Sequence, residues 1–226
     1  MQAPSRVFSA IARARRSTRQ FLAQEVNAEL MGQVLADAQN APSNCNTQPW
    51  RVHIVTGHSR VKLADALLSA HEAGGQRPDF SFDLGEFYGI YSERHHHMAA
   101  VRNNAAGISR EDSEARHADM LRNLNFYGAP HAAFLFMPAF GDCVRVASDV
   151  GMYAQTLLMS LTAHGLAGIP QTVLGFYPDT VRAMLGVPDT FKLLFGISFG
   201  YADPQAPDQQ VDIGRAPLSE SVVFHG

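Results

Sequence analysis

Arginine residues are concentrated near the start of the chain in a pattern suited to binding an anion. Arg13, Arg15, Arg16 and Arg19 fall within seven residues, and Ser17 lies among them. An arginine fork binds phosphate through two parallel hydrogen bonds, and a serine hydroxyl adds a donor. The same cations also suit the C-terminal end of a helix, where they complement its dipole. The pattern therefore indicates either a phosphate site or a solvated helix end.

A second polar segment, residues 41–50, reads APSNCNTQPW. Its two prolines favour a fixed loop, and Ser43, Asn44, Asn46 and Gln48 present hydroxyl and amide groups. Such groups could hydrogen-bond the edge of a flat heterocycle. Alternatively, they satisfy the backbone of their own loop.

The other reactive residues form no recognisable catalytic set. The sequence has no evident nucleophile–base pair and no pair of acid–base carboxylates. The histidine triplet 95–97 lacks the i, i+4 spacing of helical metal sites, so we interpret it as surface histidines and predict no metal. Cys45 is expected to be a buried, unreactive thiol. No G-x-G-x-x-G or Walker motif indicates a dedicated dinucleotide- or ATP-binding domain.

Composition narrows the function classes further. The 226 residues include 18 Lys plus Arg and 21 Asp plus Glu, and the resulting net charge of −3 argues against a nucleic-acid binder. Hydrophobic residues make up 46%, as in a packed globular core. Two cysteines cannot build a disulfide scaffold or a four-thiolate metal site.

The segment 150–178 has no Asp, Glu, Lys or Arg, so its length alone suggests a membrane span. However, it contains Gln155, His164, Pro170 and Gln171, which predict a buried helix followed by a turn and a strand. The N-terminus lacks the apolar core of a secretory signal. We therefore expect no membrane association and a cytoplasmic location.

Hydrophobic periodicity predicts interleaved helices and strands in which helices dominate, an α+β pattern. Helices are expected over 6–14, from Asn27 to before Pro42, and over 59–70, 92–103, 109–125, 144–164 and 178–185. Strands are expected over 50–54, 132–137, 169–174 and 192–201. The aromatic segment 77–91 is expected either to form a substrate lid or to fill the core. The tail from Ala202 ends in a β-prone Val-Val-Phe run, which needs a sheet edge to pair with and so could wrap a partner subunit.

Several of these segments together resemble the FMN-dependent nitroreductase family. The resemblance rests on RRSTRQF, ELMGQVLADAQNAPSNCNTQPW, HGLAGIPQTVLGF, DTVRAMLGVPDTFKLLFGISFGYAD and GRAPLSESVVF, in order along the chain. It implies a three-layer α/β/α sandwich around a mostly antiparallel central sheet, in an intertwined homodimer with C-terminal tail exchange. One domain is expected over 1–226, with 74–118 as a variable excursion or lid and 202–226 as the dimerisation tail.

The resemblance also implies where FMN binds. Arg15, Arg16, Ser17 and Arg19 would hold its phosphate, ribityl chain and pyrimidine edge, with Arg19 stabilising negative charge on the reduced ring. Arg215 would close on the phosphate, although Ile213 stands where the family often has a second basic residue. The flavin would be lined by Pro42, Ser43, Asn44 and Asn46 from the other subunit and, near N5, by Gly168, Ile169, Pro170 and Gln171.

The implied activity is reduction of nitroaromatic, quinone or similar electron-poor acceptors by ping-pong hydride transfer from NADH or NADPH through flavin N5. A flavin supplies the hydride chemistry itself, which agrees with the lack of a protein acid–base pair. The alternatives are a flavin-dependent dehalogenase or enone reductase, or a non-catalytic FMN-binding protein.

Overall fold

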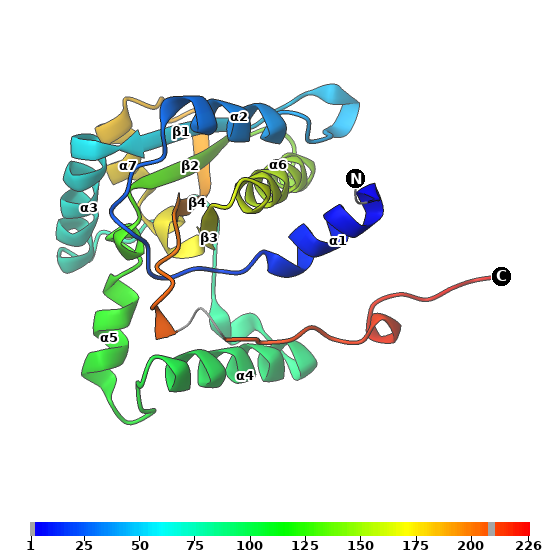
Figure 1. The fold of residues 1–226 in the computed structure, drawn as a ribbon. Helices are drawn as coiled ribbons and strands as arrows, with labels where there is room; N and C mark the ends of the chain where they lie inside the picture. Colours follow the sequence, from blue (N-terminus) through cyan, green and yellow to red (C-terminus); the bar gives the residue numbers. More distant parts are fainter. Residues whose placement is uncertain (1–2, 208–210) are drawn as a thin grey trace.

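The computed structural model describes residues 3–207 and 211–226, so positions 208–210 of the expected tail lie outside the described part. Its centre is an antiparallel sheet of four strands in the order β1–β2–β4–β3 (Figure 1). The strands are β1 (Arg51–Thr56), β2 (His131–Pro138), β3 (Ala167–Gln171) and β4 (Phe191–Gly200). The expected α+β class and the antiparallel sheet are confirmed.

Both faces of the sheet are covered, because alternate side chains of a strand point to opposite faces. Phe134 and Phe136 of β2 enter a core shared with helices α3 (Gly57–Glu72) and α7 (Pro178–Leu185). Leu135 and Met137 enter a second core with α2 (Ala28–Ala38) and α6 (Val144–Ala163). All four side chains are fully buried, which explains why β2 reads as a continuous apolar run.

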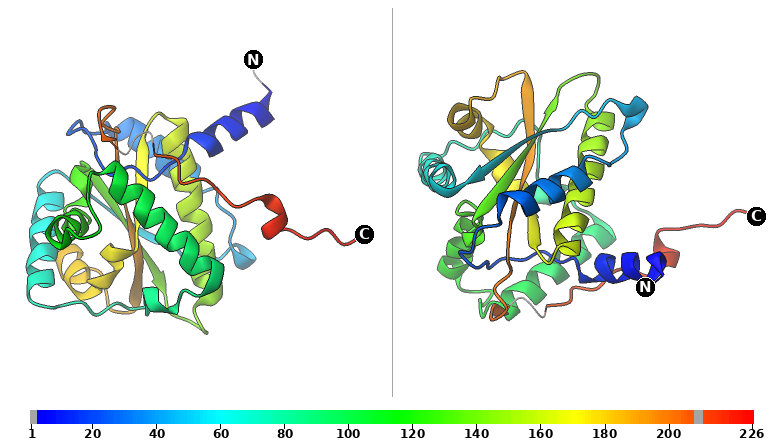
Figure 2. Two further views of the ribbon diagram at one scale, coloured as in Figure 1. Left: turned by 90° about the horizontal axis from the view of Figure 1, so that it is seen from below. Right: turned by 45° about the horizontal axis from the view of Figure 1, so that its top comes forward.

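Three further helices lie at the periphery: α1 (Pro4–Ala14), α4 (Gly89–Ala105) and α5 (Ser113–Leu121). Neither α1 nor α4 has a buried residue. Both α1 and the C-terminal tail extend from the rest of the chain on the same side (Figure 2). Apolar side chains are exposed on both segments, among them Phe8 at 65% and Phe224 at 85%.

Most expected elements are confirmed within a few residues, and the Asn27 side chain caps α2 by accepting from the backbone N–H of Leu30 at 2.8 Å. The helix expected over 109–125 is wrong at both ends. It begins at Ser113, because Asp112 rather than Ser109 caps it, and it ends at Leu121.

Two strand predictions also need correction. The strand expected over 169–174 stops at Gln171, and residues 172–176 form a 3₁₀ helix. The β-prone end of the tail, including Val223, forms no strand in the described structure and is exposed. A strand edge for this run would have to come from outside the single chain. Among the described helices, none has the length and hydropathy of a bilayer span.

Candidate functional site

The arginine-rich segment is an irregular loop that crosses one end of the sheet. Helix α1 ends at Ala14, since Arg15 leaves the helical conformation with φ −60° and ψ 122°. Ser17 then forms an isolated parallel bridge with Gly168 of β3. Phe21 forms an antiparallel bridge with Ala202, just after β4. We call residues 15–21 the arginine loop.

The arginine loop and the C-terminal tail enclose a cavity of about 540 Å³. Residues far apart in the sequence therefore meet at one place, because Arg15, Arg16, Ser17 and Arg19 line this cavity together with Arg215. The cavity is lined by Ala12, Arg13, Arg15, Arg16, Ser17, Arg19, Val211, Asp212, Ile213, Gly214 and Arg215. Among these described residues, five are arginines and one is an aspartate. We call this space the arginine cavity.

The electrostatics of the arginine cavity suit an anion. The pKa of the half-buried Arg15 is lowered from its ordinary value, first by burial and then by the positive charges of Arg215 and Arg16. A phosphate between these guanidinium groups would relieve their mutual repulsion and accept their hydrogen bonds. The hydroxyl of Thr18, inside the loop, is buried and has no hydrogen-bond partner in the structure. The guanidinium groups and the Ser17 hydroxyl that line the cavity fit the phosphate end of a nucleotide.

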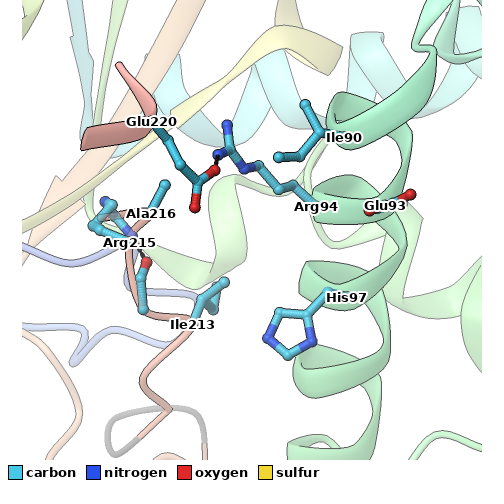
Figure 3. A pocket seen from close by; sticks show the side chains of 9 residues that line it. Ile90, Glu93, Arg94, His97, Ile213, Arg215, Ala216 and Glu220 are labelled. Carbon is cyan, nitrogen blue, oxygen red and sulfur yellow. Dashed lines mark hydrogen bonds and ion pairs between the residues drawn. The ribbon is translucent and has the colours of Figure 1, made fainter. Parts of the chain in front are cut away.

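A second cavity, of about 600 Å³, lies between α4 and the tail (Figure 3). Ile90 and His97 of α4 line one side of it, and Arg215 of the tail lines both this cavity and the arginine cavity. Arg94 of α4 forms an ion pair with Glu220 of the tail at 2.6 Å. The tail therefore connects the arginine cavity to helix α4.

The loop 42–46 does not line the arginine cavity within this chain. Its backbone is held by α6, because the carboxylate of Asp149 accepts from the N–H of Asn44 at 3.0 Å. The Ser43 hydroxyl accepts from the backbone N–H of Gln48 at 2.9 Å, so this side chain satisfies its own loop. Asn44 and Asn46 are exposed. The proposed contact of Pro42, Ser43, Asn44 and Asn46 with a flavin therefore requires a second copy of the chain.

The segment Gly168–Gln171 has both buried and exposed members. Gly168, Ile169 and Gln171 are buried, whereas Pro170 is exposed. The amide of Gln171 accepts from the Ser198 hydroxyl and donates to Asn123, so this side chain is held inside the protein. Any contact of Gln171 with a ligand would involve its backbone.

Sequence reasoning missed three groups around the site. Asp149 supports the 42–46 loop and is detectable as the single carboxylate of the mostly apolar helix α6. Arg122 donates to the backbone carbonyl of Arg19, and its neighbour Asn123 holds Gln171. No local motif marks the last two residues, because their partners lie 103 and 48 positions away in the sequence.

The remaining candidates stay outside the site. No group of three potential metal ligands occurs in residues 3–207 and 211–226. Cys45 was expected to be buried, but it is exposed and has a left-handed backbone with φ 51°. Of the aromatic segment, Phe80 packs partly against the core, whereas Tyr88 is 76% exposed. The structure therefore supports a surface role for most of that segment.

Comparison with known proteins agrees with this geometry. The model of the nitroreductase family matches residues 12–201. The chain is 47% identical over 210 residues to nitroreductase NfnB of Mycolicibacterium smegmatis, covering 93% of this chain and 89% of that protein.

Two solved structures are also similar over nearly the whole chain. The FMN-dependent nitroreductase NfnB of Mycobacterium smegmatis, in complex with NADPH, has a TM-score of 0.95 and 43% identity, covering 99% of this chain and 100% of that one. The FMN- and NADPH-dependent nitroreductase NfnB of sphigopyxis sp. strain HMH has a TM-score of 0.93 and 31% identity, covering 97% and 99%. The matched region includes the arginine loop and all four strands, and the chain belongs to the nitroreductase family.

Proposed function

We propose that this chain is an FMN-dependent nitroreductase that takes electrons from NADPH or NADH and passes them to nitroaromatic acceptors. The observation that carries the proposal is the arginine cavity, a cluster of hydrogen-bond donors formed by two distant parts of a family member. The similar proteins from M. smegmatis and sphigopyxis sp. are described as FMN-dependent, with NADPH bound or required. Quinones or other electron-poor compounds are further acceptors in this proposal.

FMN, when bound, supplies the hydride and electron chemistry, so the chain's task is to bind and orient it. Arg15, Arg16 and Ser17 would hold the phosphate and ribityl chain, and Arg215 would close over the phosphate from the tail. Arg19 would lie beside the pyrimidine edge, where a cation favours added negative charge. These roles need only positive charge and hydrogen-bond donors. They agree with a cavity lined by permanently charged arginines rather than by an acid–base pair.

The proposal includes a homodimer, because a single chain leaves both the site and its apolar surface incomplete. Helix α1 has no buried residue and exposes Val7 and Phe8 at 42% and 65%. The tail exposes Leu218 at 65% and Val223 at 74%. A partner that covers α1 and the tail would bring its own 42–46 loop to the flavin. Obligate interfaces of this kind bury roughly 2,000–5,000 Å².

The test uses purified protein. We expect a yellow protein that releases about one FMN per chain, identified by mass spectrometry, and that oxidises NADPH or NADH when a nitroaromatic is added. Parallel double-reciprocal plots against donor and acceptor would support the ping-pong order. FAD as the main cofactor, or failure to bind FMN after reconstitution, would contradict the cofactor assignment. A flavin that binds but does not turn over would leave the non-catalytic alternative.

A further inference from the structure

The segment that follows α5 contacts both halves of the candidate flavin site. Arg122 donates from Nη2 to the backbone carbonyl of Arg19, in the arginine loop. The next residue, Asn123, accepts from the Gln171 side chain through its backbone carbonyl at 3.0 Å and through Oδ1 at 3.2 Å. Two adjacent residues thus fix the arginine loop on one side and the end of β3 on the other.

The guanidinium of Arg122 is itself held in place. Its Nη1 donates to Oδ1 of Asp119 at 3.2 Å, and its Cζ lies 5.3 Å from the ring centroid of Tyr127. The Asp119 side chain is only 8% exposed and also pairs with Arg102 of α4. Although the Arg122 side chain is 44% exposed, these partners give its planar group a defined orientation.

Gln20 anchors the arginine loop to Asp203, beyond β4, through its backbone carbonyl and its side chain, but the direct contact of the loop with β3 is weak. The N–H of Thr18 is 3.5 Å from the carbonyl oxygen of Gly168, at the long limit of hydrogen bonding. The Thr18 hydroxyl is buried without a partner, so it adds no bond there. The carbonyl of Arg19 belongs to the peptide group that joins Arg19 to Gln20. The bond from Arg122 therefore holds the plane of this peptide and restricts the backbone from which the Arg19 side chain extends.

We infer that Arg122 is a positioning residue that fixes the arginine loop, and with it Arg19, in the geometry that binds the cofactor. The identity of the cofactor in this inference rests on the proposed function. The effect of Arg122 on the loop does not depend on it. Through Asp119 and Arg102, the same contacts connect the loop to α4, whose residues line the neighbouring cavity.

The experiment compares Arg122→Lys with Arg122→Met. A lysine has one compact ammonium in place of the fork, so it can keep the pairing with Asp119 but not also the bond to the Arg19 carbonyl. We expect R122K to retain nearly the wild-type Tm. Both variants should exchange the backbone amides of residues 15–22 about tenfold faster in flavin-free protein, measured by hydrogen–deuterium exchange. Both should bind FMN about tenfold more weakly.

Arg116→Met is the matched control. Arg116 is an exposed arginine of α5 that donates only within its own helix turn, to the carbonyl of Asp112 at 3.3 Å. This variant should keep wild-type loop exchange and FMN affinity. The inference is wrong if R122K and R122M have a lower Tm but wild-type loop exchange and FMN affinity, or if none of the three changes. Arg122 then only balances the charge of Asp119.

The two proposals fail in different ways. Wild-type protein that binds no FMN would contradict the proposed function, while the exchange measurement on flavin-free protein would still decide whether Arg122 fixes the loop. If the wild type binds FMN but the Arg122 variants match it in both loop exchange and affinity, only the positioning role is overturned.

Discussion

Replacing Arg215 by alanine should weaken FMN binding without harming the flavin-free protein. Arg215 is exposed, and its side chain donates to the carbonyl of the adjacent Gly214 at 2.6 Å, so it contributes little to packing. Its positive charge lowers the pKa of Arg15, which means that the two cations repel each other when no anion is present. Arg215→Ala should therefore leave the Tm of the flavin-free protein unchanged or slightly higher.

The loss of Arg215 should reduce the affinity for FMN. A charge-assisted hydrogen bond to phosphate contributes about 1.5–3 kcal/mol, which corresponds to roughly one to two decades in Kd. Arg110→Ala provides the control, because Arg110 is exposed between α4 and α5 and does not line the arginine cavity. Saturating FMN should restore most of the turnover of Arg215→Ala.

Arg19→Ala should behave differently if Arg19 lies beside the pyrimidine edge. Loss of its charge should lower the flavin midpoint potential and slow flavin reduction by NADPH or NADH, and excess FMN should not repair either change. The assays are fluorescence titration of flavin-free protein, a redox titration and stopped-flow reduction at saturating FMN. Wild-type potential and reduction rate in Arg19→Ala would refute the electronic role. Unchanged Kd in Arg215→Ala would refute the phosphate contact.

Three further predictions concern the supports of the site. Asp149→Ala should speed amide exchange around Asn44 about tenfold, whereas Asp149→Asn should retain much of the protection because one acceptor oxygen remains. Ending the chain after Gly214 should cost both the dimer and bound FMN, and a truncated protein that stays dimeric and yellow in size-exclusion chromatography would contradict the role of the tail. Burial lowers the pKa of His131, whose Nε2 accepts from the N–H of Val26 at 2.9 Å, so stability should be full above its ordinary value of about 6.5 and fall as the pH drops below it. His131→Gln should flatten this dependence in urea melts, and an unchanged slope would count against His131 as its source.

Local chemistry explains why the sequence predicted most elements. The i, i+4 spacing of the buried Val34 and Ala38 and the capping by Asn27 define α2 without help from distant residues. The apolar run of β2 can only be buried on both faces, as observed for Phe134 and Leu135. Errors occurred where tertiary contacts decide. The segment 172–176 has a β-prone composition, yet it folds as a 3₁₀ helix with Leu174 buried in the core.

The candidate site divides in the same way. The arginine loop was predictable because its residues are adjacent in sequence, and Arg215 was reached through the family resemblance. Arg122 and Asn123 were not predictable, because an arginine and an asparagine at a helix end have many ordinary roles. Their relevance depends on the fold, which brings the end of α5 against the arginine loop and β3. The exposure of Cys45 likewise depends on where the fold places its loop rather than on its residue type.

The proposed site and the fold should respond to pH through different groups. The cations of the arginine cavity are guanidinium groups, which remain charged throughout the range in which the protein is folded. FMN affinity near neutral pH should therefore follow the second ionisation of the phosphate itself, with a pKa of about 6. The fold instead depends on the buried His131 and the partly buried His53, because burial lowers the pKa of both, with Arg51 adding to the effect on His53. Acid should therefore weaken FMN binding by protonating the phosphate, and weaken the fold by protonating histidines. Substitution of His131 should change the pH dependence of stability and leave the pH dependence of FMN affinity unchanged.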